Sequence, residues 1–356
     1  MPSLTSQIGI FGVAMQTAFA GLGTASANAL SVASASGALG AAGGYTFMPM
    51  MAIPQLLNRA MDNMPVEING QRGDSGAYVK NYVVGGEIDM LFRTRPSLFF
   101  WESLLGTRVS TATTGATADA ATKFSFGNSE TYKYLSLIRN IGDKVVESHQ
   151  DIIVDGVTVT MRQGEPVSLK WGIVGLKGQQ LNVTATAANN PAVTAQWDRN
   201  KPLAAVGDLG KISLTGLTLT VLNAELTIQQ NTTRDEFCIG SYYVDDMTKL
   251  GFSVGLTCDV AIKNADLYQK VQYNSATYGD LSLVIPSIDS STLEMKSPDL
   301  MSTINRSCKI TIGTLELLSL PLQLAGNNLL RGTLTARGKI PASGYNIACE
   351  IITNAA

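Results

Sequence analysis

The sequence predicts a mainly β protein with two related β-sandwich or barrel domains, each with a short flanking helix, and an extended N-terminal arm. Three observations favour this fold class: one long strand with strict alternation, an internal repeat and a scarcity of strong helix signals. Thr, Ser, Gly and Val are abundant, and this composition favours twisted sheets and turns over helices.

The predicted arm covers residues 1–45, which are rich in Ala, Gly and Ser and only weakly periodic. No charged residue or histidine precedes Arg59, and the apolar run Ile8–Leu22 is too short to span a bilayer. A signal peptide would need a basic region before this run, and none is present. We therefore expect an uncharged arm that a neighbouring subunit orders, with Ile8, Phe11 and Phe19 as its apolar contacts.

The clearest strand is Phe252–Lys263, where apolar and polar residues alternate along the whole segment. A period of two indicates a half-buried strand, because successive side chains point to opposite faces. A short helix is predicted from about Gln55 to Met64. Further strands are predicted at Tyr78–Phe92, Asp151–Met161, Pro166–Leu176, Ile212–Gln229, Lys309–Leu318, Gly332–Ile340 and Tyr345–Ile352.

An internal repeat organises the chain. The order apolar, acidic, three apolar, basic, polar occurs in Ile88–Thr94 and again in Cys258–Asn264, 170 residues later. In each copy we expect a strand, an N-cap (Ser97 or Asp266) and a short helix. A looser match relates Val154–Leu176 to Lys309–Leu324. The sequence therefore predicts one β-rich domain that has been duplicated.

The repeat sets the predicted domain boundaries. The first β domain covers residues 46–184 and the second covers residues 211–356. Residues 185–210 contain Asn189-Asn190-Pro191 and many small residues, so they are the predicted linker. Thr107–Thr122 is predicted to be an exposed loop between strands.

Composition limits the classes of function. Charged residues make up 15% of the chain, against a usual share of about 25%, so much of the surface is not designed to stay in water. A net charge of −2 gives no basic footprint for gripping nucleic acid. The four cysteines form no CxxC pair, and their spacing does not require a disulfide. Free thiols in a reducing assembly compartment are the simpler interpretation, and a disulfide is the alternative.

Signs of catalysis are missing from the sequence. His149 is the single histidine, in a polar stretch that we interpret as a solvated loop. A multi-histidine metal site is thereby excluded, and a nucleophile with a histidine base would depend on this one residue. We expect no catalytic, cofactor-binding or metal-binding residues, and hence a structural protein.

The order of these segments resembles the tail tube proteins, or major tail proteins, of long-tailed bacteriophages. The Gly85–Asp89 strand, Arg95-Pro96 and the short helix that ends at Leu105-Gly106 look like the corresponding elements of that family. This sequence departs from the family in its longer uncharged arm and in Ser136, where the family often has Thr. The other matching segments are Gln7–Ile10, Gln16–Phe19, Gly23-Thr24, Tyr134–Gly142, Asp155–Thr160 and Pro166–Gly175.

The resemblance implies a virion protein that is assembled in the host cytoplasm and polymerises into stacked rings around a DNA conduit. Its partners would be further copies of itself in trimeric or hexameric rings, the tape-measure protein and the tail-terminator or baseplate proteins. DNA would pass through the lumen without specific binding during genome ejection, and no membrane anchor or cofactor is implied. In such a tube the arm would lie between rings.

Four charged residues in the repeated segment are candidates for the lumen or for a subunit interface: Asp89, Arg93, Asp259 and Lys263. They lie opposite the apolar positions of the matched strands. A near-neutral or acidic surface would let DNA pass without gripping its phosphates. Ordinary solvent-facing strand charges would give the same pattern.

Other classes stay open at this point. Another virion β-protein, such as a baseplate, connector or decoration component, would share the composition. A secreted adhesin or an outer-membrane barrel is a further alternative, although a barrel would need aromatic girdles, and aromatic residues are 7% and scattered. A hydrolase would require a cleft with convergent titratable groups.

Overall fold

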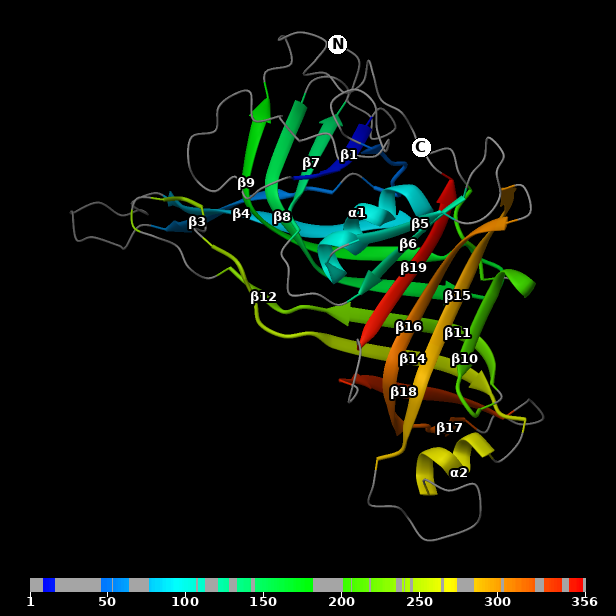
Figure 1. Cartoon of the computed structure of the whole chain (residues 1–356). Coiled ribbons are helices and arrows are strands. Elements are labelled where there is room, and N and C mark those ends of the chain that lie inside the picture. Colours follow the sequence, from blue (N-terminus) through cyan, green and yellow to red (C-terminus); the bar gives the residue numbers. More distant parts are fainter. Residues whose placement is uncertain are drawn as a thin grey trace.

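The computed structural model confirms a mainly β fold, with two short α-helices among the residues that it describes (Figure 1). It describes residues 9–16, 46–52, 54–63, 77–106, 108–112, 121–127, 133–141, 145–181, 201–205, 207–217, 219–234, 239, 241–243, 246–263, 266–273, 285–301, 304–323, 330–340 and 346–354.

The elements fall into two groups along the chain. The first contains β1 (Gly9–Met15), β2 (Thr46–Phe47), β3 (Leu57–Asn63), β4 (Ala77–Leu91), α1 (Thr94–Leu105), β5 (Arg108–Ala112), β6 (Ala121–Gly127), β7 (Leu135–Ile141), β8 (Val145–Arg162) and β9 (Ser168–Leu181). The second contains β10 (Gly210–Leu214), β11 (Thr220–Gln229), β12 (Thr232–Thr233), β13 (Thr248–Lys249), β14 (Ser253–Ala261), α2 (Asp266–Tyr273), β15 (Ser287–Met301), β16 (Ile304–Ser319), β17 (Leu322–Gln323), β18 (Arg331–Lys339) and β19 (Ile347–Asn354).

Except for the small β12–β13 pair, the described strands belong to one antiparallel hydrogen-bonded network. In Figure 1 the strands β4, β8, β11, β14 and β18 follow one another down the molecule, and β10, β15, β16 and β19 cross them at a steep angle. Most buried apolar side chains of both groups join in one hydrophobic core, and a smaller cluster holds Ile153, Val174, Leu176 and Met247. The arrangement is a two-layered β structure with the core between the layers.

The two groups repeat the same set of strand pairings. In the first group β1 pairs with β7, β7 with β8, β8 with β9, β9 with β4 and β4 with β3. In the second group β10 pairs with β15, β15 with β16, β16 with β18, β18 with β14 and β14 with β11. A helix follows β4 in one group and β14 in the other.

An irregularity in the pairing also repeats. The register of β8 against β9 shifts between Val154 and Gly156, and that of β16 against β18 shifts between Leu317 and Ser319. The two shifts lie at equivalent places, because positions 317 and 319 follow positions 154 and 156 by the same 163 residues. The strands that match Val154–Leu176 are therefore those near residues 317–339, and the expected match with Lys309–Leu324 was out of register.

Helix α1 is held by aromatic packing. The Phe100 ring stacks on the Trp171 ring with centroids 5.1 Å apart. The Trp101 ring contacts the Trp171 ring edge-on, with centroids 5.2 Å apart. All three side chains are fully buried, so the helix is anchored on β9 by some of the largest apolar surfaces in the chain.

Several local predictions were wrong. Leu57–Asn63 is a strand and not a helix, because its backbone pairs with β4. The expected N-caps are also wrong: Arg93 precedes α1 in an extended conformation, Ser97 lies inside the first turn and bonds the Arg93 and Thr94 carbonyls, and α2 already begins at Asp266.

Two further segments differ from expectation. The predicted Ile212–Gln229 strand is split into β10 and β11 by a turn in which the Leu217 amide bonds the Leu214 carbonyl. Part of the predicted Thr107–Thr122 loop is the strand β5, which pairs with β6, while residues 113–120 lie outside the described residues. Of the predicted linker, Leu203 is buried and bonded through its backbone to Phe92 and Val167.

Candidate functional site

A continuous polar sheet face runs through both groups of strands. The register places Asp89 opposite Lys170, Lys170 opposite Thr158 and Thr158 opposite Thr227. Thr227 in turn lies opposite Gly255, and Gly255 opposite Arg337. Since residues that are directly opposite in a sheet share a face, this row crosses β4, β9, β8, β11, β14 and β18 on the side away from the core.

The structure places both predicted aspartates on this face. Asp89 is exposed on β4, and Asp259 pairs with Asn223 of β11 and Thr333 of β18. The Asp259 carboxylate accepts hydrogen bonds from Thr333 Oγ1 at 2.9 Å and from Asn223 Nδ2 at 3.3 Å. The two predicted basic residues are not on the strands: Arg93 precedes α1 and is half-buried, and Lys263 is exposed beyond the end of β14.

Several basic side chains of the polar face form ion pairs with carboxylates. Lys170 Nζ lies 2.6 Å from Glu87 Oε2, and the hydrogen bond to Glu87 raises the pKa of Lys170, with Asp89 adding to the effect. Glu316 receives Arg337 at 2.7 Å and Lys339 at 3.3 Å. Paired in this way, these cations offer little free positive charge to a phosphate backbone.

The two groups of strands meet along a seam between β8 and β11. Residues Gly156–Arg162 pair with Asn223–Gln229 in antiparallel register, and the Gln230 amide donates to the Asp155 carbonyl at 2.7 Å. The strands approach closely, because a Cβ on Gly156 would lie 2.6 Å from the Ile228 carbonyl oxygen. A second seam joins β6 to β19. The first seam makes a single sheet out of two repeated units.

Comparison with known families decides what this architecture belongs to. The model of the family described as phage tail tube protein matches residues 11–328, which is most of the chain. The chain belongs to the phage tail tube protein family. No curated protein matches it.

Membership fixes the general role. This tail tube protein is a structural component of the virion tail, and the alternative of a baseplate, connector or decoration component is not favoured. Neither helix in the described part of the chain is long and apolar enough to cross a membrane. Within the described residues, no group of three or more His, Cys, Asp or Glu side chains could hold a metal ion.

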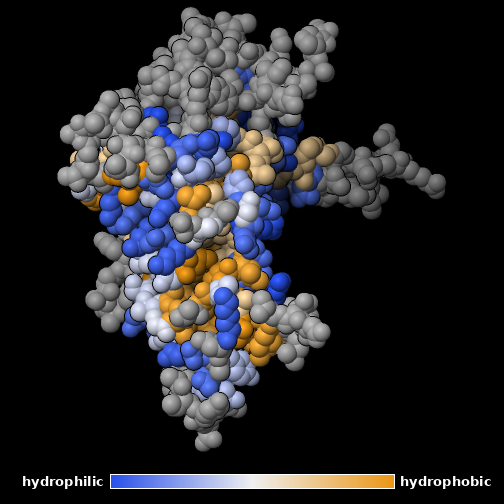
Figure 2. All heavy atoms as spheres, turned by 90° about the vertical axis from the view of Figure 1, so that its right-hand side faces the viewer, coloured by the Kyte–Doolittle hydropathy of each residue, from blue (hydrophilic) through white to orange (hydrophobic). Residues whose placement is uncertain are grey.

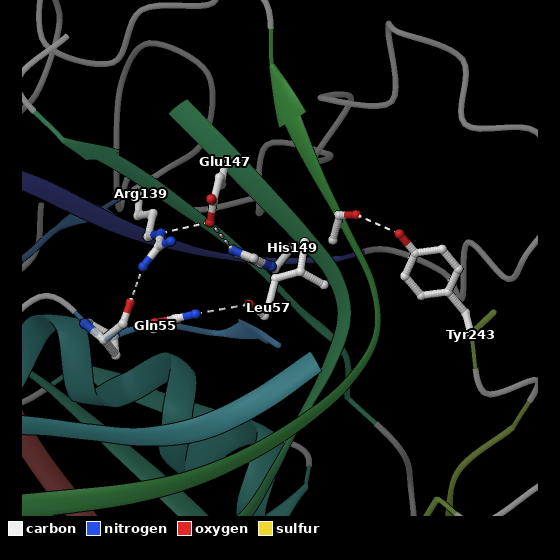
Figure 3. A network of polar contacts seen from close by, with 8 residues as sticks. Gln55, Leu57, Arg139, Glu147, His149 and Tyr243 are labelled. Atoms are coloured by element: carbon white, nitrogen blue, oxygen red, sulfur yellow. Dashed lines mark hydrogen bonds and ion pairs between the residues drawn. The ribbon is translucent and has the colours of Figure 1, made fainter. Parts of the chain in front are cut away.

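The tail tube protein has a buried polar cluster that the sequence did not predict (Figure 3). Glu147 Oε2 accepts a hydrogen bond from Arg139 Nε at 2.7 Å and lies 3.4 Å from His149 Nε2. The neighbouring His149 imidazole, followed by the hydrogen bond from Arg139, lowers the pKa of Glu147 to about 2. Arg139 also donates from Nη1 to the Pro54 carbonyl at 2.6 Å, so the cluster fixes the segment before β3.

His149 therefore corrects the sequence interpretation of a solvated loop. It is fully buried on β8, packed so closely against β9 that a Cβ on Gly178 would lie 2.7 Å from its Nδ1. Residues 148–154 are all buried, so no alternation marks this stretch and the sequence offered no local signal for the burial of His149.

The prediction of an arm ordered by a neighbouring subunit is wrong for residues 9–15. These form β1, which pairs with β7 along its whole length, and the Phe11 side chain is 1% exposed in its own subunit. Phe11 is thus a core residue and needs no neighbouring subunit to bury it. Ile8 and Phe19 lie outside the described residues.

The described cysteines are buried and free. Cys308 and Cys349 lie on neighbouring strands with Sγ atoms 3.6 Å apart. Burial raises the pKa of both Cys258, to about 12, and Cys349. Such thiols act as small apolar side chains rather than as nucleophiles.

Proposed function

We propose that this tail tube protein polymerises into closed rings that stack into a hollow tube, through which DNA passes into the host. One observation carries the proposal: two units with the same strand pairings are joined edge to edge in one sheet. Within one chain, the pairing of β8 with β11 joins the first unit to the second. If the same kind of pairing joined neighbouring chains, the sheet would close into a barrel without an exposed edge.

We propose residues 46–184 and 211–356 as the two repeated domains, with residues 185–210 as the linker. Three chains would then supply six similar domains, giving a ring with pseudo-six-fold symmetry. Six chains per ring is the alternative. Head-to-tail contacts that do not close on themselves would stack the rings into a filament.

The polar sheet face is the proposed lumen surface. It carries Asp89 and Asp259, and three of its cations, Lys170, Arg337 and Lys339, are ion-paired. A wall of this kind lets a polyanion slide, because it offers no array of free cations for counterion release. This role requires no enzymatic chemistry.

Apolar surface elsewhere favours contacts between subunits. Figure 2 shows hydrophobic side chains gathered on the lower body, over the region that holds β10 and β15 in Figure 1. Ile212, Leu217 and Leu219 of this region are only partly buried. Apolar patches of this kind mark interaction sites on soluble proteins. The tape-measure and tail-terminator or baseplate proteins are further proposed partners, and the host cytoplasm is the proposed place of assembly.

Negative-stain microscopy of the purified protein tests the proposal. We expect hollow tubes of uniform diameter, and three chains per ring by mass measurement of isolated rings. A monomer that stays dispersed at high concentration would overturn the proposal. Rings of six chains would overturn the trimeric arrangement alone.

A further inference from the structure

The second unit ends in an open strand edge. β15 covers one side of β16 as far as Leu317, whose amide bonds the Pro286 carbonyl. Beyond that point Ser319, Leu322 and Gln323 pair with β18 on their other side, and no described strand pairs with them on the β15 side. An unpaired edge of this kind is a template for another strand.

The repeat identifies what this edge is equivalent to. In the first unit Gly156 lies opposite Gly172 and Val159 opposite Leu169. In the second unit Ser319 lies opposite Thr335 and Leu322 opposite Gly332, each residue 163 positions further along. Residues 319–323 are therefore the counterpart of 156–160, the stretch of β8 that pairs with β11 across the seam.

The same reasoning finds the counterpart of β11. Ile228 lies opposite Val254, and Leu57 lies opposite Val84, which precedes Val254 by the repeat distance of 170. The Gly85 amide bonds the Leu56 carbonyl in the matching register. Residues 54–58 thus stand where residues 225–229 stand in the second unit. In Figure 1 β3 and β17 lie at opposite ends of the succession of strands.

We propose that residues 319–323 of one chain pair with residues 54–58 of a second copy, in the register that joins β8 to β11. Gln229 opposite Gly156 becomes Asn58 opposite Ser319, and Thr227 opposite Thr158 becomes Leu56 opposite Pro321. The inference rests on the proposed function, because it assumes that chains join by the same step that joins the two units.

The proline in this edge is compatible with pairing. The Gln230 amide bonds the Asp155 carbonyl, so every second residue from 155 onwards directs its backbone groups towards β11. On the open edge these positions are Leu318, Leu320 and Leu322. Pro321 faces β18 instead, so its missing N–H removes no hydrogen bond from the proposed contact.

Both edges carry exposed apolar side chains. Leu318 and Leu322 are 44% and 37% exposed on one edge, and Met51 is 67% exposed next to the other. On the same segment, the Gln55 amide side chain reaches the Leu57 carbonyl at 3.5 Å, a weak bond that an incoming strand can replace (Figure 3). Burial of these leucines would add apolar stabilisation to the backbone pairing.

One difference separates the two seams. Ser319 has a side chain where the first unit has Gly156, at a point where a Cβ would clash with the Ile228 carbonyl oxygen. The contact between copies must therefore be slightly wider at Ser319 than the seam within the chain.

Cysteine cross-linking in assembled tubes tests the register. Asn58→Cys with Ser319→Cys places two thiols in a non-hydrogen-bonded antiparallel pair, the geometry that a disulfide bridges most easily. The control is Asp62→Cys with Ser319→Cys, which moves one thiol by four residues along β3. All chains also carry Cys238→Ser, and each single variant is run alongside.

On non-reducing gels we expect a ladder that stops at three chains for the first pair, and at least a tenfold weaker ladder for the control. Intact tubes without that ladder, or with an equal ladder in the control, would overturn the register and leave the proposed function standing. Absence of tubes from the unmodified chain would overturn both.

Hydrogen exchange on the unmodified chain gives a second reading that needs no engineered thiol. We expect the amides of Leu320, Leu322, Gln55 and Leu57 to exchange at least tenfold more slowly in tubes than in dispersed subunits. Unchanged exchange at these amides in intact tubes would overturn the inference.

Discussion

The hydroxyl oxygens of Thr94 and Thr353 lie 2.9 Å apart in a buried hydrogen bond, although the two residues are 259 positions apart in the sequence. Thr94 begins α1 and Thr353 lies near the end of β19, so the bond joins the helix of the first unit to the last strand of the second. Beside it, β19 pairs with β6 of the first unit. The C-terminal strand is thus part of the contact between the two units.

We expect Thr94→Val to lower the free energy of unfolding by about 1–3 kcal/mol, because the change removes one partner of a buried polar pair. Urea denaturation of unassembled subunits measures the loss. The double variant Thr94→Val/Thr353→Val should lose less than the sum of the single changes, with a coupling of about 1 kcal/mol. Strict additivity of the two changes would show that the bond contributes nothing.

The seam between β8 and β11 predicts a sensitive glycine. A methyl group on Gly156 would lie 2.6 Å from the Ile228 carbonyl oxygen, whereas nothing lies within 4 Å of the equivalent methyl on Gly255 of β14. Gly156→Ala should therefore destabilise the protein by about 1–3 kcal/mol, while Gly255→Ala should change stability by less than about 0.5 kcal/mol. Thermal unfolding of the two variants makes the comparison, and equal melting temperatures would contradict the close approach.

The repeated strand–helix segment was predictable because its signals are local. The alternation of Phe252–Lys263 gave β14 within two residues, since one face is buried and the other is not. The helix at Gln55–Met64 was wrong although its apolar residues follow the helical spacing, because the backbone pairing of Leu57–Asn63 with β4 overrides this local pattern.

The polar sheet face was half predictable. Asp89 and Asp259 alternate with buried residues, so their outward direction follows from the sequence. Arg93 and Lys263 lie past the strand ends, where the period of two no longer applies. The buried cluster around His149 and the β8–β11 seam depend on contacts between residues far apart in the chain, which no local pattern encodes.

The buried cluster predicts a pH dependence. The neighbouring His149 imidazole and the hydrogen bond from Arg139 lower the pKa of Glu147 from 4.5 to about 2. A carboxylate with a depressed pKa stabilises the fold fully above its unfolded value, and this stabilisation is lost as the pH falls from about 4.5 to about 2. Glu147→Gln should lower the melting temperature at pH 7 and flatten its dependence on pH in that window.

Glu165→Gln is the matched control for the pH measurement. Glu165 is exposed in the β8–β9 turn, and its ion pair with Arg162 is exposed and long, at 3.9 Å. Melting curves from pH 7 to pH 2 should be nearly the same for this variant and the unmodified chain. A Glu147→Gln curve parallel to that of the unmodified chain would contradict the role of the cluster.

The proposed lumen surface predicts how added positive charge would act. Asp89→Lys with Asp259→Lys should leave tube formation intact and make the tubes bind double-stranded DNA in a salt-dependent manner, because free cations on the wall release counterions from the phosphates. Co-sedimentation of DNA with tubes at 50 and 200 mM salt measures the effect. Asp62→Lys with Glu165→Lys adds the same charge away from this face, and equal DNA binding by both pairs would contradict the assignment.

The segment between β1 and β2 is the part of the predicted arm whose proposed place is between rings. Val13 lies opposite Thr46, so the two ends of this segment are neighbours, and a short Gly/Ser linker can replace residues 17–45 without moving β1. We expect the shortened chain to melt within a few degrees of the unmodified protein and to form rings. It should fail to form long tubes, because the replaced segment would supply contacts between rings.

Microscopy and sedimentation measure tube length, and a chain with the same segment in scrambled order separates specific contacts from segment length. Tubes of normal length from the shortened chain would show that residues 17–45 are not needed for stacking.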